Sequence, residues 1–166
     1  MKKLNFGCGK KIIKGWINVD IQKGKGIDKS FNFNKMPYPF KKDIFDYILL
    51  DNVLEHLEDP IKVLNELHRI CKKDAIIKII VPHYNCKGAY NDITHKHYFN
   101  ETSFDNIVNS HNHYGIKKKT KFKIIKLELI PTRLGKIIYP KRLRQMVGLV
   151  LGEVFKAIDV ELIVIK

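Results

Sequence analysis

Two glycines and an aspartate within the first twenty residues have the types and spacing of a ligand-binding turn. Gly7 and Gly9 flank Cys8 directly after an apolar segment, and Asp20 ends the next one. Glycine has no side chain and tolerates positive φ, so the backbone of such a turn can approach a ligand closely. An acid at the end of a second strand can accept hydrogen bonds from ribose hydroxyl groups. The pattern indicates a nucleotide-like ligand, although a glycine pair alone would equally suit an ordinary turn.

Three histidines stand where a proton acceptor would be useful. His56 follows one predicted buried strand, His83 follows the next, and His95 lies in a polar segment shortly after Asp92. Histidine titrates near neutral pH, which makes it the natural base for a hydroxyl or amine nucleophile. We therefore predict His95, His83 and His56 as the catalytic residues. A structural role, in which His56 hydrogen-bonds the backbone and shapes its turn, is an equal alternative.

The spacing of the histidines and cysteines does not predict a metal site. His95 and His97 would share one face of an extended segment, as would His111 and His113. Imidazole is a common metal ligand, but no carboxylate or cysteine completes a recognised spacing such as H-E-x-x-H. The three cysteines form no CxxC pair, so neither a disulfide framework nor a thiolate zinc site is indicated; they are Cys8, Cys71 and Cys86.

The chain is strongly basic, with 31 Lys and Arg against 17 Asp and Glu and a formal net charge of +14. This charge would attract an anionic substrate such as a phosphosugar, nucleotide, RNA or lipid headgroup. Arginine is the preferred residue for bidentate contacts to bases and phosphates, yet it occurs only at Arg69, Arg133, Arg142 and Arg144. Nucleic acid is therefore an alternative that we do not favour, and a solvated loop also explains the run at Lys117–Lys119.

The length of 166 residues predicts one domain, spanning residues 1–166. No stretch approaches the roughly 20 uninterrupted apolar residues of a membrane span. Gly7 follows the first residue too closely for a signal peptide. We therefore expect a cytoplasmic protein. The oligomeric state is not predicted.

Alternating strand-like and helix-like apolar segments predict an α/β fold with a mostly parallel sheet. Strands are expected at residues 4–6, 17–21, 30–33, 45–50, 75–81, 122–129 and 160–165. Asp59 and Pro60 are typical of a helix start, and the apolar spacing continues that helix to residue 70. A second amphipathic helix is expected over residues 140–158, with its apolar face packed on the sheet. Only residues 10–16 separate the first two strands, fewer than a crossover helix normally needs.

Residues 83–120 differ from the rest of the chain. They are rich in His, Asn, Tyr and Thr and show little regular periodicity, apart from a short helix expected at residues 102–109. A long polar segment inside a compact domain is usually a functional loop or lid. We expect this segment to cover an acceptor site.

Several ordered motifs resemble the class I S-adenosylmethionine (SAM) dependent methyltransferases related to the type-11 group. The resemblance covers most of the chain, and motifs in the right order are more specific than any one of them. They are Leu4–Gly9 with Gly15–Asp20, Phe45–Tyr47 with the "VLEH" stretch Val53–His56, Leu67–Lys72 with Ile79–His83, and Asp92–Phe99. The resemblance implies a Rossmann-like seven-stranded sheet with helices on both faces and an antiparallel last strand beside the fifth.

The resemblance also assigns residues to the cofactor. It places Gly7, Cys8 and Gly9 on the methionine and ribose side of SAM, and Asp20 with Ile21 beside the ribose hydroxyls. Asn32 with Phe33 falls at the adenine, and Asp51 with Asn52 at the methionine end. The methyl acceptor is expected to be a small molecule or glycan-type substrate. RNA methylation is the alternative within the family, and a non-catalytic binding protein is the alternative outside it, since Lys10 or Lys11 replaces the usual third glycine.

Overall fold

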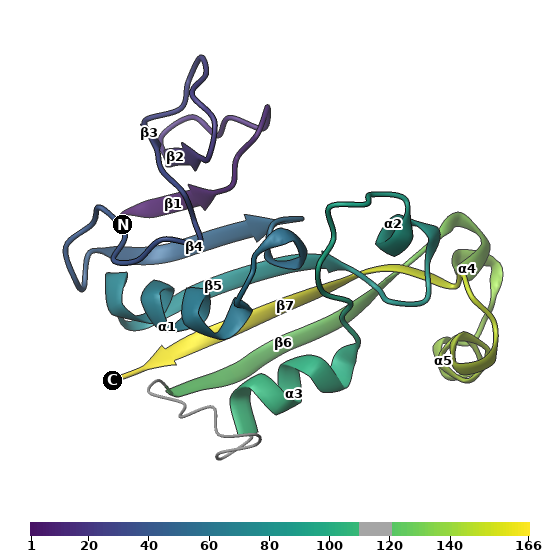
Figure 1. Cartoon of the computed structure of the whole chain (residues 1–166). Coiled ribbons are helices and arrows are strands. Elements are labelled where there is room, and N and C mark those ends of the chain that lie inside the picture. Colours follow the sequence, from purple (N-terminus) through teal and green to yellow (C-terminus); the bar gives the residue numbers. More distant parts are fainter. Residues whose placement is uncertain (110–120) are drawn as a thin grey trace.

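A computed structural model of the chain describes residues 1–109 and 121–166 (Figure 1). Seven strands form one sheet in the order β3-β2-β1-β4-β5-β7-β6. Their bounds are β1 Lys3–Phe6, β2 Ile17–Asp20, β3 Lys29–Ser30, β4 Phe45–Asp51, β5 Cys71–Pro82, β6 Lys121–Pro131 and β7 Phe155–Ile165. β7 is antiparallel to both β5 and β6, whereas the pairs from β3 to β5 are parallel. The expected mostly parallel sheet with an inserted antiparallel last strand is confirmed.

The helices are η1 Leu54–His56, α1 Pro60–Ile70, α2 Lys87–Tyr90, α3 Glu101–Asn109, α4 Arg133–Ile137 and α5 Lys141–Val150. α1 starts as expected, because the side chain of Asp59 accepts a hydrogen bond from the backbone of Lys62 and Pro60 occupies the first turn. No helix among the described residues is long and apolar enough to cross a membrane.

The two faces of the sheet differ in character. One face carries fully buried apolar side chains, and α1 and α3 both pack against it (Figure 1); the sheet residues include Leu4, Phe6, Ile48, Leu50, Ile77, Ile79, Val160 and Leu162. On the opposite face Lys78 pairs with Asp159 at 3.0 Å. The expected helix layers on both faces are only partly realised, because no helix connects β1, β2 and β3.

Two buried asparagines take the place of the missing first crossover helix. Asn5 Nδ2 donates to Lys11 O at 2.7 Å and to Asn18 Oδ1 at 2.9 Å. Asn18 Oδ1 also accepts from Ile13 N at 2.9 Å, and its Nδ2 donates to Ile13 O and Trp16 O at 3.0 and 3.2 Å. The short loop thus receives from side chains the hydrogen bonds that a helix would supply from its own backbone.

The helix expected over residues 140–158 is wrong beyond residue 150. α5 ends at Val150, a turn follows in which Glu153 has a φ of 64°, and β7 begins at Phe155. The packing expected for its apolar face is also wrong, because the side chains of Leu143, Met146 and Val150 are exposed. From residue 160 to residue 165, buried positions alternate with more exposed ones, as in a strand whose two faces have different neighbours.

The segment expected to form a lid lies beyond the end of β5. His83 forms a parallel bridge with Phe99, so the chain between them loops out, with α2 inside it, before α3 returns along the sheet (Figure 1). The short helix expected here is confirmed as α3. His111, His113 and Lys117–Lys119 lie outside the described residues.

Candidate functional site

A first cavity opens where β1, β2 and β4 end. These strands are neighbours and run parallel, so the residues that follow them meet at one edge of the sheet. The cavity has a volume of about 260 Å³. Its lining combines polar and apolar side chains: Gly7, Asp20, Ile21, Asn32, Phe33, Asn34, Asn52, Val53, His56 and Leu57. Ligands of open α/β sheets bind at this kind of crevice.

The turn after β1 requires glycine at its first position. Gly7 has a φ of +73°, and a Cβ added there would lie 2.4 Å from Cγ2 of Val53. The turn is bonded to β2, because Val19 O accepts from the backbone N–H groups of Gly7 and Cys8. Gly9 N donates to Asp20 Oδ2 at 2.7 Å, which places the Asp20 carboxylate beside the turn. The glycine turn and the carboxylate of Asp20 therefore lie next to each other, as the sequence predicts.

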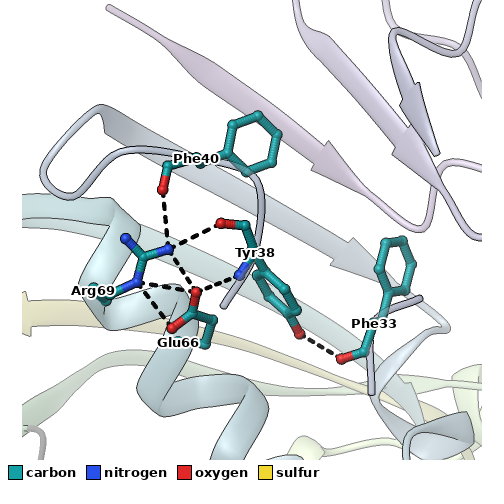
Figure 2. Close-up of polar contacts among 5 residues, drawn as sticks. All are labelled: Phe33, Tyr38, Phe40, Glu66 and Arg69. Carbon is teal, nitrogen blue, oxygen red and sulfur yellow. Dashed lines mark hydrogen bonds and ion pairs between the residues drawn. The ribbon is translucent and has the colours of Figure 1, made fainter. Parts of the chain in front are cut away.

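A polar network behind the first cavity holds its Phe33 wall in place. Figure 2 shows Tyr38 donating its hydroxyl to Phe33 O, at 2.8 Å. The backbone N–H of Tyr38 donates to Glu66 Oε1 at 2.7 Å, and Arg69 binds both oxygens of Glu66 and the carbonyl oxygens of Tyr38 and Phe40. Because Glu66 and Arg69 belong to α1, the network fixes this wall to a rigid helix.

The end of β4 turns sharply toward the next group of residues. Asn52 has a φ of 55°, a left-handed conformation that asparagine tolerates better than most residues. Its Nδ2 donates to Asp51 Oδ1 at 2.8 Å. The other oxygen of Asp51 accepts from Lys11 Nζ at 2.6 Å, so a cation from the first crossover loop lies at this edge.

A second, larger cavity adjoins the first and shares the side chains of Asn52 and His56 with it. Its volume is about 510 Å³. The loop segment supplies much of its lining, together with the end of β5: Asn52, Glu55, His56, Pro82, Gly88, Asn91, Asp92, Ile93, His95 and Lys156. The described part of the segment expected to form a lid therefore lines this cavity.

Backbone hydrogen bonds bring two of the predicted histidines together. The N–H groups of Lys96 and His97 both donate to Glu55 O, which fastens the loop to η1. The rings of His56 and His95 consequently meet edge to face, with their centroids 4.6 Å apart.

Burial changes the protonation of this group. The side chain of Glu55 is 1 % exposed, and burial raises the pKa of its carboxyl to about 7. Burial, followed by the charge of His95, lowers the pKa of His56. The ring of His56 is therefore neutral at pH 7 and has a lone pair available.

His83 lies apart from both cavities. It is 4 % exposed, its ring contacts Tyr84 and Phe155, and its Nε2 lies 3.6 Å from a carboxylate oxygen of Glu101. Burial lowers the pKa of His83, and Glu101 opposes this effect. The structure thus separates His83 from His56 and His95.

Of the residues predicted to bind the cofactor, six line the first cavity: Gly7, Asp20, Ile21, Asn32, Phe33 and Asn52. Cys8, Gly9 and Asp51 support its edge without lining it. Glu55 and Lys11 were missed as site residues. The only sequence signal for Glu55 was its position directly before His56, and its burial depends on the loop that packs on it.

Comparisons with known proteins agree with this architecture. Residues 1–125 match a family described as "Methyltransferase domain". A SAM dependent methyltransferase from Archaeoglobus fulgidus is similar in structure, with a TM-score of 0.68 and 16% identity over 98% of this chain and 85% of that chain. A second such enzyme, from Mesorhizobium loti, has a TM-score of 0.62 and 13% identity over 98% and 90% of the two chains. No curated protein matches the chain.

Proposed function

Because the chain belongs to the methyltransferase domain family, we propose that residues 1–166 act as one domain that transfers the methyl group of SAM to an acceptor. SAM would occupy the first cavity and the acceptor the second. The observation that carries this proposal is the junction of the two cavities, whose shared lining is Asn52 and His56.

The lining of the first cavity suits the parts of SAM. The Asp20 carboxylate can accept hydrogen bonds from two ribose hydroxyls, and the apolar side chains of Ile21, Phe33 and Leu57 suit an adenine ring. The amide of Asn32 can bond the polar edge of that ring. Lys11 of the first crossover loop reaches Asp51 at the edge of this cavity, and none of residues 10–16 lines the cavity itself.

SAM supplies a methyl group on a positively charged sulfur, and the protein must align an acceptor with it. We assign the acceptor side to His56 and His95, whose rings meet in the second cavity. His83 lines neither cavity, and we assign it a positioning role at the bridge to Phe99.

The second cavity favours a small acceptor. Cavities of roughly 300–1,000 Å³ are typical for small-molecule ligands, and this one measures about 510 Å³. Lys156 at its wall and the net charge of +14 would favour an anionic group on the acceptor, including a glycan-type one. RNA binding whose affinity falls steeply with salt would instead identify RNA as the acceptor.

Calorimetric titration of SAM into the folded protein tests the proposal. We expect saturable one-to-one binding that weakens about 10- to 100-fold in Asp20→Ala, because the ribose hydroxyls lose a charged acceptor. Asp105→Ala, an exposed change on α3, should bind SAM like the unchanged protein. Absence of binding at millimolar SAM, in protein shown to be folded by circular dichroism, would rule the proposal out.

A further inference from the structure

Glu55 is a buried carboxylate without a hydrogen-bond partner. Its side chain is 1 % exposed, and neither Oε1 nor Oε2 accepts a hydrogen bond from the described residues. A buried carboxylate normally requires a donor or a positive charge, since it has lost the solvation of water. The neighbours that could satisfy it are His56 and His95, and one ligand atom from each of the three residues lies within 4.8 Å of the others.

The tautomer of His95 is defined by its backbone partner. His95 Nδ1 lies 2.8 Å from Ala89 O. A carbonyl oxygen can only accept, so the proton of the neutral ring must be on Nδ1. The lone pair of His95 is then on Nε2.

His56 is held in the same tautomer by a chain of two hydrogen bonds. Its Nδ1 lies 2.9 Å from Thr94 Oγ1, and the Thr94 hydroxyl donates to Asp92 Oδ1 at 2.7 Å. Thr94 has donated its only proton and must accept from His56, so the lone pair of His56 is also on Nε2. A histidine whose second nitrogen is bonded to an outer polar group is the usual arrangement of a metal ligand.

We propose that Glu55, His56 and His95 bind a divalent transition-metal ion. Two imidazole nitrogens and a carboxylate are a donor set found in zinc and non-haem iron sites. Atoms bound to one such ion at about 2.1 Å are separated by roughly 3 to 4 Å. A contraction of about 1 Å from the present spacing therefore completes the site.

The proposed ion would have open coordination positions facing the second cavity. The three ligand residues all line that cavity, whose volume of about 510 Å³ exceeds what one ion and its waters need. An oxygen of the acceptor could then bind the ion close to Asn52, where the two cavities join. This orienting role depends on the proposed methyl transfer, whereas the binding of the ion does not.

Cobalt binding provides a test that does not depend on activity. Protein dialysed against EDTA and then freed of chelator is titrated with Co²⁺, and the visible absorption of the bound ion is recorded. We expect one Co²⁺ per chain, displaced by Zn²⁺, with affinity at least about 100-fold weaker in Glu55→Gln and in His95→Gln. His97→Gln is the matched control and should bind like the unchanged protein, because His97 bonds Glu58 O outside the cluster.

A second variant addresses the orientation of the ligands. Thr94→Val breaks the link from Asp92 to His56 without removing a ligand, and we expect Co²⁺ binding to weaken about 10- to 100-fold. The proposal is overturned if the unchanged protein binds no stoichiometric Co²⁺, as expected if Glu55 merely shares a proton with a histidine. It is also overturned if Glu55→Gln binds as tightly as the unchanged protein.

SAM calorimetry on the same stripped sample separates this proposal from the previous one. SAM binding without Co²⁺ binding would contradict the metal site alone. Stoichiometric Co²⁺ binding without SAM binding would contradict the proposed function alone.

Discussion

At the scale of single residues, the ion pair of Lys11 and Asp51 is the contact that SAM would have to replace when it binds. Their ion pair of 2.6 Å lies at the end of β4, where the family resemblance puts the methionine part of SAM. The ammonium group of that methionine would compete with Lys11 for the same carboxylate. The Lys11 side chain is 72% exposed, so solvent can replace Asp51 as its partner at low cost.

Lys11→Met should therefore tighten SAM binding. We expect the affinity for SAM to rise about two- to fivefold. This range corresponds to the free energy of one exposed ion pair, which SAM would no longer have to break. Calorimetry measures it, with Lys10→Met as the control for lost charge at an exposed neighbouring position. Equal gains in both variants would mean that Asp51 does not receive the ammonium group.

His83 makes stability depend on pH through its burial. Because its pKa in the folded protein is lowered, the unfolded chain takes up a proton first as the pH falls. The contribution of His83 is thus complete above its unfolded pKa of about 6.5 and is lost on acidification. Glu101 faces the ring and reduces the effect.

His83→Gln should show a weaker dependence of the free energy of unfolding on pH between 7 and 5. The difference in slope cannot exceed one proton, which is about 1.4 kcal/mol per pH unit. Denaturant unfolding at several pH values measures it, and His97→Gln serves as a histidine control. A slope unchanged from that of the parent protein would contradict the buried neutral state of His83.

Sequence reasoning predicted that Gly7, Asp20 and Asn52 lie at one site, because each lies at the carboxyl end of a parallel strand, and all three line the first cavity. It grouped His83 with His56 and His95, although only the latter two meet. Which histidines meet depends on the hydrogen bonds from the loop to Glu55 O, and local sequence carries no signal for such a contact. The same loop buries Glu55. The sequence therefore could not show that the carboxyl group of Glu55 lacks a hydrogen-bond partner.

At the scale of elements, the connection between β1 and β2 shows how a fold can lose a helix. Asn5 and Asn18 are both 3% exposed and bond the loop from within the sheet. The sequence predicted that residues 10–16 are too few for a crossover helix. It did not predict that two asparagines on neighbouring strands would hold the loop by hydrogen bonds. Their pairing depends on the register Asn5↔Asn18 between β1 and β2.

Asn18→Ala should destabilise the protein by about 2–4 kcal/mol. It leaves Asn5 Nδ2 with one partner fewer and removes the bonds to the backbone of Ile13 and Trp16, and each unsatisfied buried group costs about 1–3 kcal/mol. Urea unfolding measures this change. Gln22→Ala, at an exposed position in the loop after β2, should stay within about 0.5 kcal/mol of the parent.

The region after residue 140 shows why element boundaries were the weaker part of the prediction. The spacing of Val147, Val154 and Ile158 in the sequence fits one face of a helix. Ile158 is instead buried by strand pairing, because β7 inserts between β5 and β6, whereas Val154 is buried in the turn before β7, beside Gly148 of α5. An insertion between two distant strands is a property of the whole sheet, and periodicity within one segment does not encode it.

At the scale of the whole molecule, sheet topology explains both the uneven faces and the position of the site. The steps from β1 to β2 and from β4 to β5 run in opposite directions across the sheet. Right-handed crossovers therefore put their connections on opposite faces. α1 covers one face, while the loop of residues 10–16 replaces a helix on the other. The order in which strands are added to the sheet reverses direction between β1 and β4. A crevice forms at this point, and Gly7, Asp20 and Asn52 lie together in it.

The central claim is that this crevice holds SAM and presents its methyl group to the cavity of His56 and His95. A crystal structure with S-adenosylhomocysteine, the demethylated product, tests it most directly. We expect the ribose hydroxyls to bind Asp20, the adenine to lie beside Asn32 and Phe33, and the sulfur to point toward His56 and the second cavity. Product bound elsewhere, or with its sulfur turned away from the second cavity, would contradict it.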